Sequence, residues 1–197
     1  MLRLSIAIYF TFVILISSSR VSADTQSEIA SIRKLYAKIE GARPLRSQKF
    51  EFNVEGGPME GTITRDEYEG ALIRITLSYV SSDHGGADQT FYFGSKGLFF
   101  AFEVASSWKF GKPAPNGDST TIDRRIENRF YFAEGQCIRQ LRRSAQAADA
   151  KQLPRLIGDE KNVTVEPGEE AATVFKRALA LRGIATGAEA ARYFELE

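Results

Sequence analysis

The sequence is poor in the side chains that carry out most enzyme chemistry and in those that staple small folds. Its 197 residues include one cysteine, one histidine and one tryptophan. A single thiol cannot close an intramolecular disulfide, and a lone histidine leaves few ways to build a catalytic base or a metal site. With 43% apolar residues and 26 basic against 25 acidic side chains, the composition is that of an ordinary globular domain. Disulfide-stapled, collagen-like and disordered chains are excluded.

The first 23 residues have the pattern of an export signal. Arg3 precedes a largely apolar run from Leu4 to Ile16, and Val21-Ser22-Ala23 places small residues before a cleavage site. We expect cleavage after Ala23 and export to the bacterial periplasm or the extracellular space, since the lack of disulfides favours a bacterial envelope. The alternative is a retained anchor, but a 13-residue run spans only about 20 Å of the roughly 30 Å hydrocarbon core.

Charge is the next property that limits the function. Without the leader, 24 basic and 25 acidic residues remain in a chain of 174. Proteins that bind nucleic acids need an excess of lysine and arginine on one face, so near-neutrality argues against such a partner. A chain of this length buries roughly 70% of its unfolded surface. We therefore expect a single self-sufficient domain over residues 24–197, which is not an integral membrane protein once the signal is removed.

Helical periodicity occurs at both ends of this domain. Thr25-Gln26-Ser27-Glu28 is a capping box, which predicts a helix over residues 24–40. Its apolar stripe consists of Ile29, Ile32, Leu35, Tyr36 and Ile39. Residues 167–194 predict two further helices, the first ending at Gly183 and the second capped by Thr186 and Glu189. The first of these has an expected apolar face of Val174, Phe175, Ala178 and Leu179.

Between the helices, residues 47–143 alternate with a period of two. In one expected strand, Ile73, Ile75, Leu77 and Tyr79 share a face. Turns rich in glycine separate such runs, for example at Glu69-Gly70 and Glu134-Gly135. The sequence therefore predicts an α+β fold: an antiparallel meander sheet of about seven strands, covered by the N-terminal helix and the C-terminal helices.

Three of the expected hairpins share a form. In the segments 68–72, 92–98 and 131–138, aromatic residues close one strand, a glycine turns the chain, and an aliphatic residue opens the next strand. Over residues 68–141 the chain resembles the aromatic–glycine hairpins of MORN-variant repeats, which occur in uncharacterised bacterial secreted and envelope proteins. The resemblance implies a scaffold or binding surface, because such repeats have no catalytic residues in common.

The candidate reactive groups are few. His84 lies in the loop Asp83-His84-Gly85-Gly86-Ala87-Asp88, where it and the two aspartates form a weak candidate for a hard cation, without the spacing of a calcium loop. Cys137 begins a strand and is more typical of a small buried side chain than of a nucleophile. Glu60, Asp66, Glu67 and Glu69 alternate as on a solvated sheet face. No Gly-x-Ser-x-Gly elbow is present, and we expect no catalytic residue, cofactor or metal ligand.

Two candidate partner-binding features remain. Arginines gather on two strands that we expect to pair, and Arg125, Arg129, Arg139 and Arg143 share one parity. They predict a basic stripe for an anionic partner or lipid head groups, or else a solvent face neutralised by Asp123 and Glu127. The second feature is the segment 106–119, which contains Trp108 and is the longest irregular stretch expected within the sheet region.

The phenylalanines in the expected strands have two possible roles. Phe91, Phe93, Phe100, Phe102, Phe130 and Phe132 are core residues or the lining of an aromatic cavity. We prefer a non-catalytic exported protein that binds an envelope protein or lipid through a sheet face or the 106–119 loop. The alternatives are a carrier of an apolar ligand in a Phe-lined half-barrel, similar to periplasmic lipoprotein carriers, and a hydrolase that uses His84 or acidic residues.

Overall fold

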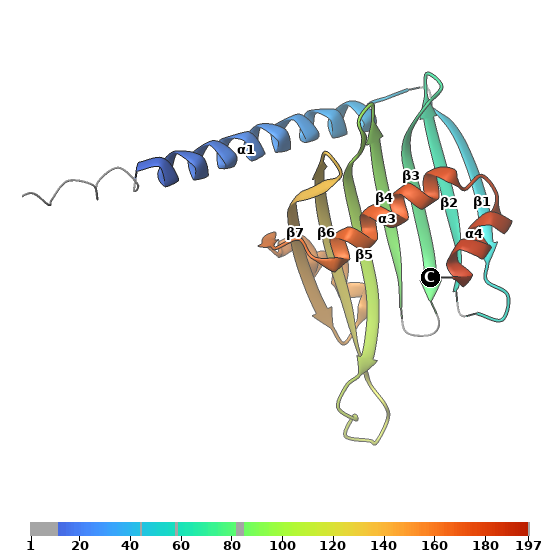
Figure 1. Ribbon diagram of the computed structural model, residues 1–197. Coiled ribbons are helices and arrows are strands. Elements are labelled where there is room, and N and C mark those ends of the chain that lie inside the picture. Colours follow the sequence, from blue (N-terminus) through green and yellow to red (C-terminus); the bar gives the residue numbers. More distant parts are fainter. Residues whose placement is uncertain (1–11, 44, 58, 82–84, 197) are drawn as a thin grey trace, which may run out of the picture.

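The computed structural model describes residues 12–43, 45–57, 59–81 and 85–196, with side chains from residue 24 onward. Within these ranges, eight strands form one antiparallel sheet in the order of the chain (Figure 1). The strands are β1 (Arg46–Asn53), β2 (Met59–Tyr68), β3 (Ala71–Ser81), β4 (Gly85–Gly94), β5 (Gly97–Phe110), β6 (Thr121–Ala133), β7 (Gln136–Ala147) and β8 (Val163–Val165). The expected meander is confirmed, with the short β8 added at one edge.

The described helices lie on both faces of the sheet. They are α1 (Phe12–Glu40), α2 (Leu153–Asp159), α3 (Glu169–Gly183) and α4 (Gly187–Glu195), and a short 3₁₀ turn (Ala150–Gln152) precedes α2. α3 and α4 cover one face, which we call the α3/α4 face, and α1 and α2 pack on the opposite α1/α2 face. The α+β fold class is confirmed.

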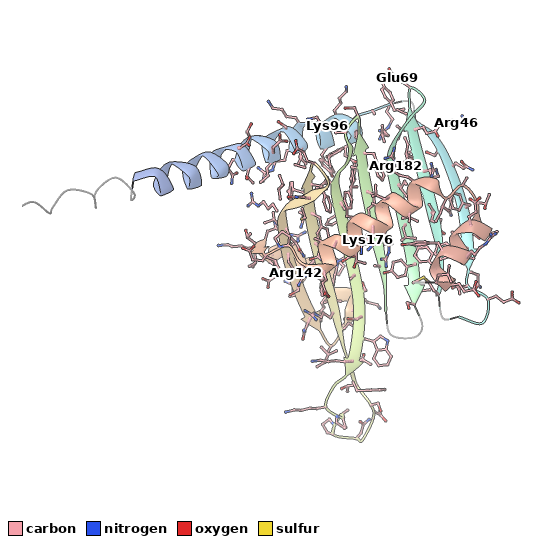
Figure 2. All side chains as sticks on the ribbon, in the orientation of Figure 1. Arg46, Glu69, Lys96, Arg142, Lys176 and Arg182 are labelled. Atoms are coloured by element: carbon pink, nitrogen blue, oxygen red, sulfur yellow. The ribbon has the colours of Figure 1, made fainter. Side chains whose placement is uncertain are left out.

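Tight turns connect alternate strands at one end of the sheet. Glu69 and Gly70 have φ angles of 51° and 77°, and Glu134 and Gly135 have φ angles of 50° and 80°. Two successive residues with positive φ match the twist of antiparallel strands, and this is the role of the glycine in each pair. A third tight turn, which contains Lys96, connects β4 and β5. Figure 2 shows Glu69 and Lys96 at the same end of the molecule. The predicted turns at these positions are confirmed.

The larger core lies on the α3/α4 face. Phe91, Phe93, Phe130 and Phe132 are almost fully buried there and pack with Val174, Ala178, Leu181 and Phe194 of the two helices. Each buried phenylalanine contributes about 1.5–3 kcal/mol to stability through the burial of its side chain. The expected apolar face of α3 is wrong at Leu179, which is 44% exposed. Leu181 takes its place because the helix turns its Ala171, Val174, Ala178 and Leu181 side to the sheet.

A second, smaller core lies under α1 on the opposite face. Ile29, Ile32 and Ile39 are buried against aromatic residues of the sheet, Tyr92, Phe99, Phe100 and Tyr131. The ring of Tyr36 meets those of Tyr92 and Phe100 edge to face, at centroid distances of 5.1 and 5.4 Å. α2 covers the far part of the same face, where Leu153 and Ile157 pack on Ala145. The stripe predicted for the first helix is therefore a core stripe at Ile29, Ile32 and Ile39, with Leu35 partly buried, whereas Tyr36 is exposed at the margin of this core.

Polar contacts fix the end of α1 on the sheet. Arg74 donates hydrogen bonds to Asp66 at 2.7 Å and to Glu40 of α1 at 2.8 Å, and the Tyr92 hydroxyl donates to Glu40 at 3.2 Å. Burial alone would lower the pKa of Arg74, but the hydrogen bonds and charges of Asp66 and Glu40 raise it above its ordinary value. Burial also raises the pKa of Tyr92. Asp66 itself is buried. The expectation that Glu60, Asp66, Glu67 and Glu69 lie on a solvated sheet face is therefore wrong at Asp66.

Two expectations about element boundaries and faces are also corrected. α1 begins at Phe12, so Thr25 lies inside the helix rather than at its N-cap. The sequence has no proline or glycine between these positions that would stop the helix upstream of Thr25. Ile73 packs in the core under α1, whereas Ile75 belongs to the core on the α3/α4 face. The reason is an irregularity in the β2–β3 pairing at Asp66, which shifts the alternation of β3.

The segment expected as a loop over 106–119 is largely strand at its start. β5 continues to Phe110, and the irregular part is 111–120. Ser106 to Phe110 pair in register with Arg125 to Thr121 of β6, which satisfies the backbone groups that face β6. The two strands extend past the ends of their neighbours as a projecting hairpin (Figure 1). We call residues 106–124 the arm.

The contact between α4 and the edge strand β1 yields a stability prediction. A Cβ atom on Gly187 would overlap the carbonyl oxygen of Glu51, whereas nothing lies within 4 Å of the corresponding position on Gly183. We expect Gly187→Ala to lower the free energy of unfolding by about 1–3 kcal/mol through overpacking. Gly183→Ala, the matched control, should raise it by about 0.5–1 kcal/mol. Urea denaturation measures both, and equal effects would contradict the close approach.

Candidate functional site

Three arginines and one glutamate form a cluster on the α1/α2 face. In the register of β6 and β7, Arg125 lies opposite Ala145, Glu127 opposite Arg143, and Arg129 opposite Leu141. Alternation directs Arg125, Glu127 and Arg129 to one face of β6, and the pairing brings Arg143 beside them. We call Arg125, Glu127, Arg129 and Arg143 the arginine cluster.

The carboxylate of Glu127 is the centre of this cluster. Its residue is only 5% exposed, and Oε2 accepts hydrogen bonds from Arg143 Nε at 2.8 Å and Arg129 Nη2 at 3.3 Å. Arg125 Nε lies 3.6 Å from Oε1. A carboxylate this deeply buried needs a counter-ion. One arginine would supply it, so three leave two positive charges in excess.

The arginines differ in how firmly they are held. The guanidinium of Arg129 lies 4.9 Å from the centre of the Phe102 ring and donates a hydrogen bond to Asn162 Oδ1 at 3.0 Å. Arg125 Nε is buried without a hydrogen-bond partner among the described residues. Of the three guanidinium groups, that of Arg125 is therefore held least firmly by hydrogen bonds. Arg125 is also the one of the three that lines the adjacent groove.

This groove runs between the sheet and the start of α2. Its volume is about 520 Å³, within the range of sites that bind small molecules or peptide side chains. Apolar side chains from the sheet and α2 line it together with charged ones: Val80, Asp88, Val104, Trp108, Arg125 and Leu153. The groove thus offers apolar contact beside charges of both signs, because Asp88 and Asp123 line it together with Arg124 and Arg125.

The structure brings some of the predicted site residues together and separates others. Arg125, Arg129 and Arg143 form the cluster, with Trp108 farther along the groove. Arg139 lies opposite Tyr131 and is not among the described arginines that pair with Glu127. Asp88 lines the groove, whereas Asp83 and His84 lie outside the described residues.

Cys137 lies away from this cluster. It packs at the margin of the core on the α3/α4 face, and its Sγ donates to the carbonyl oxygen of Arg139 at 3.4 Å. Burial raises the pKa of the thiol above its ordinary value. A raised pKa is the opposite of what a nucleophilic cysteine requires.

A row of polar side chains on the α3/α4 face was missed by the sequence analysis. Gln89, Glu103, Asn128 and Arg142 are consecutive partners across β4, β5, β6 and β7. Gln89 donates to Glu103, Asn128 donates to Glu103 at 3.0 Å, and Arg142 donates to Asn128 at 2.8 Å. We call these four residues the polar row. A signal existed, because Gln89 and Asn128 each lie two residues from a core phenylalanine and so share its face.

The polar row joins the sheet to α3. Glu170 of α3 accepts hydrogen bonds from Asn128 at 3.1 Å and Gln140 at 2.7 Å and forms an ion pair with Arg142. Arg177 donates to Gln89 at 3.2 Å. Figure 2 shows Arg142 near the N-terminal end of α3. Because these groups satisfy one another, the row fixes the position of the helix on the sheet.

The described residues outside these networks add little chemistry. Among them, no three histidine, cysteine, aspartate or glutamate residues come close enough to hold a metal ion. None of the described helices is both long and apolar enough to cross a membrane. Comparison with family models, curated proteins and solved structures finds no match for this chain. The resemblance of residues 68–141 to MORN-variant repeats stays a prediction.

The arginine cluster yields a prediction about stability. Glu127→Gln retains the shape of the side chain but leaves three guanidinium groups without their common counter-ion. Breaking a buried ion pair costs about 3–5 kcal/mol, and we expect the low end, about 3 kcal/mol, because the arginines are partly solvated. Glu67→Gln is the matched control, since the one ion pair of Glu67 within the described part of the chain is with the exposed Arg46 at 3.9 Å, a contact worth less than about 1 kcal/mol. Denaturant titration compares the two, and an equal loss would contradict a buried role for Glu127.

Proposed function

We propose that this chain is an exported, non-catalytic protein that binds an anionic stretch of a macromolecular partner on its α1/α2 face. The observation that carries the proposal is the arginine cluster, in which three guanidinium groups surround a single buried carboxylate. A purely structural role for Glu127 needs only one of them. The other two give this part of the sheet a positive field directed at a partner.

The groove beside the cluster supports a contact with a macromolecule. Trp108, Val104 and Leu153 provide apolar surface, and Arg125 provides charge at the same place. Interfaces commonly combine aromatic and arginine anchors in this way, since both contribute large contact areas and directional hydrogen bonds. An acidic segment of an envelope protein fits this arrangement.

The ligand-carrier alternative receives less support. Phe91, Phe93, Phe130 and Phe132 belong to the core that packs against α3, and only Phe100 and Phe102 line a cavity, one of about 260 Å³ under α1. That volume is below the roughly 300–1,000 Å³ usual for ligand sites. The hydrolase alternative depends on His84, which lies outside the described residues, or on acidic side chains, of which Asp66 and Glu127 are committed to ion pairs.

Export is tested by the N-terminus of the protein isolated from its host. We expect a mature chain that begins at Asp24, recovered in the periplasmic or extracellular fraction, because the leader is too short to remain as a span. Intact mass measurement of each cell fraction gives the answer. A full-length chain in the cytosol would overturn the exported part of the proposal.

Binding is tested by removing charge inside and outside the cluster. The double variant Arg125→Gln/Arg129→Gln should lose at least about tenfold in affinity for a synthetic ten-residue glutamate-rich peptide, measured by fluorescence anisotropy at low salt. Arg46→Gln/Arg155→Gln, which removes the same charge from exposed sites on β1 and α2, is the matched control and should change the affinity by less than about twofold. Equal losses in the two double variants would show that only net charge matters and would overturn the site.

A further inference from the structure

We propose that the arm attaches the protein to an anionic lipid surface through Trp108 and Phe110. This contact is separate from the arginine cluster and goes beyond the binding of a macromolecular partner. Three features of the arm carry the inference: its projection from the sheet, an aromatic pair in which Phe110 is exposed and Trp108 is half-buried, and a tip whose backbone is partly hydrogen-bonded within itself.

The arm is a two-stranded ribbon with no further strand beside it. Among the described residues, β4 pairs with β5 no farther than Ser107, and β7 pairs with β6 no farther than Asp123. Trp108 to Phe110 therefore pair with no described strand except β6, where the hairpin projects in Figure 1. A two-stranded hairpin in water is marginally stable by itself. Its apolar side chains have no sheet core to enter.

An aromatic pair lies on one side of this ribbon. Phe110 is 68% exposed, the most exposed large aromatic residue among those described. The ring of Trp108 meets it edge to face, with centroids 5.2 Å apart and planes at 87°. Tryptophan and its aromatic neighbours favour the boundary between lipid head groups and hydrocarbon, where the ring is apolar and the indole N–H stays hydrated.

The tip of the arm satisfies much of its own backbone. Gly111 N–H donates to Thr120 at 2.9 Å, Ala114 N–H to Asp118 at 2.9 Å, and Gly117 N–H to Ala114 at 2.8 Å. The side chain of Thr120 donates to the carbonyl of Lys112 at 2.6 Å. Peptide groups that are paired internally lose little when they leave water, which lowers the cost of entering the interfacial region.

The charges around Phe110 favour anionic head groups. Lys109 and Lys112 precede and follow it in the chain, and both are exposed. Arg124, also exposed, lies farther back along the arm, opposite Ser107. Long basic side chains can reach the head groups while their stems follow the aromatic rings into the interface. Asp118 and Asp123, the latter directly opposite Trp108, oppose this attraction in part. The carboxylate of Asp118 accepts a hydrogen bond from Asn116 at 2.7 Å within the tip. The lysines make phosphate-bearing anionic lipids the better surface.

The sole tryptophan of the chain makes this proposal directly measurable. The mature protein, residues 24–197, is mixed with vesicles of phosphatidylcholine alone or with about 30% phosphatidylglycerol, an anionic surface. We expect a blue shift of Trp108 fluorescence with the anionic vesicles and quenching by lipids brominated along their acyl chains. Phe110→Ser should weaken partitioning at least about tenfold. Lys109→Gln and Lys112→Gln should each weaken it about fivefold.

Matched variants distinguish lipid contact by the arm from adsorption elsewhere on the protein surface. Val163→Ser removes an apolar side chain of similar exposure, 63%, from β8 on another part of the surface, and should leave partitioning unchanged. Absence of a shift with both vesicles would overturn the proposal. So would a shift that grows with protein concentration without lipid, which would indicate self-association. If partitioning into vesicles falls in Arg125→Gln/Arg129→Gln and not in Phe110→Ser, the lipid contact lies at the arginine cluster and the proposal is overturned. If Phe110→Ser still binds the glutamate-rich peptide, the lipid contact and the peptide contact are distinct surfaces.

Discussion

Unbroken antiparallel pairing from β1 to β8 is the constraint on which the rest of this structure depends. Pairing in chain order fixes the parity of every side chain, so each strand contributes to both faces at once. Neither face is left bare along its whole length: α3 and α4 bury one, and α1 and α2 bury parts of the other. The open stretches that remain, between the helices, are where binding surfaces can form.

The two polar networks of the protein are built from neighbouring residues on opposite faces. Glu127 and Arg143 belong to the arginine cluster, while the adjacent Asn128 and Arg142 belong to the polar row. The polar row contacts α3 through Glu170 and Arg177 and holds that helix on the sheet. The arginine cluster lies beside an open groove and retains excess charge. The same pair of strands therefore holds a helix in place on one face and presents the arginine cluster beside a groove on the other.

Much of this arrangement follows from local patterns in the sequence. Alternation and Glu-Gly turns predict the strands, and the capping box of Thr186 and Glu189 predicts α4, as observed. Parity predicts that Arg125 and Arg129 share a face of one strand and that Arg139 and Arg143 share a face of the next. What parity cannot predict is the partner across the ladder. The register that places Arg143 beside Glu127, and the irregularity that turns Ile73 to the other core, depend on how each strand pairs with the next one, which alternation within a single strand does not specify. The arm was not predicted, because the prolines and glycine at 113–117 are typical of a loop. The residues on either side of them nevertheless pair as strands.

The two ends of the sheet differ in the length of their connections. At the end marked by Glu69 and Lys96, two-residue turns leave no room for variation without disturbing the twist of the strands. At the opposite end the chain crosses between strands through longer segments, including the tip of the arm. Insertions or deletions at that end would change reach and surface chemistry while leaving both cores untouched. Evolutionary variation in this fold therefore has one permissive end, and it is the end that carries the arm.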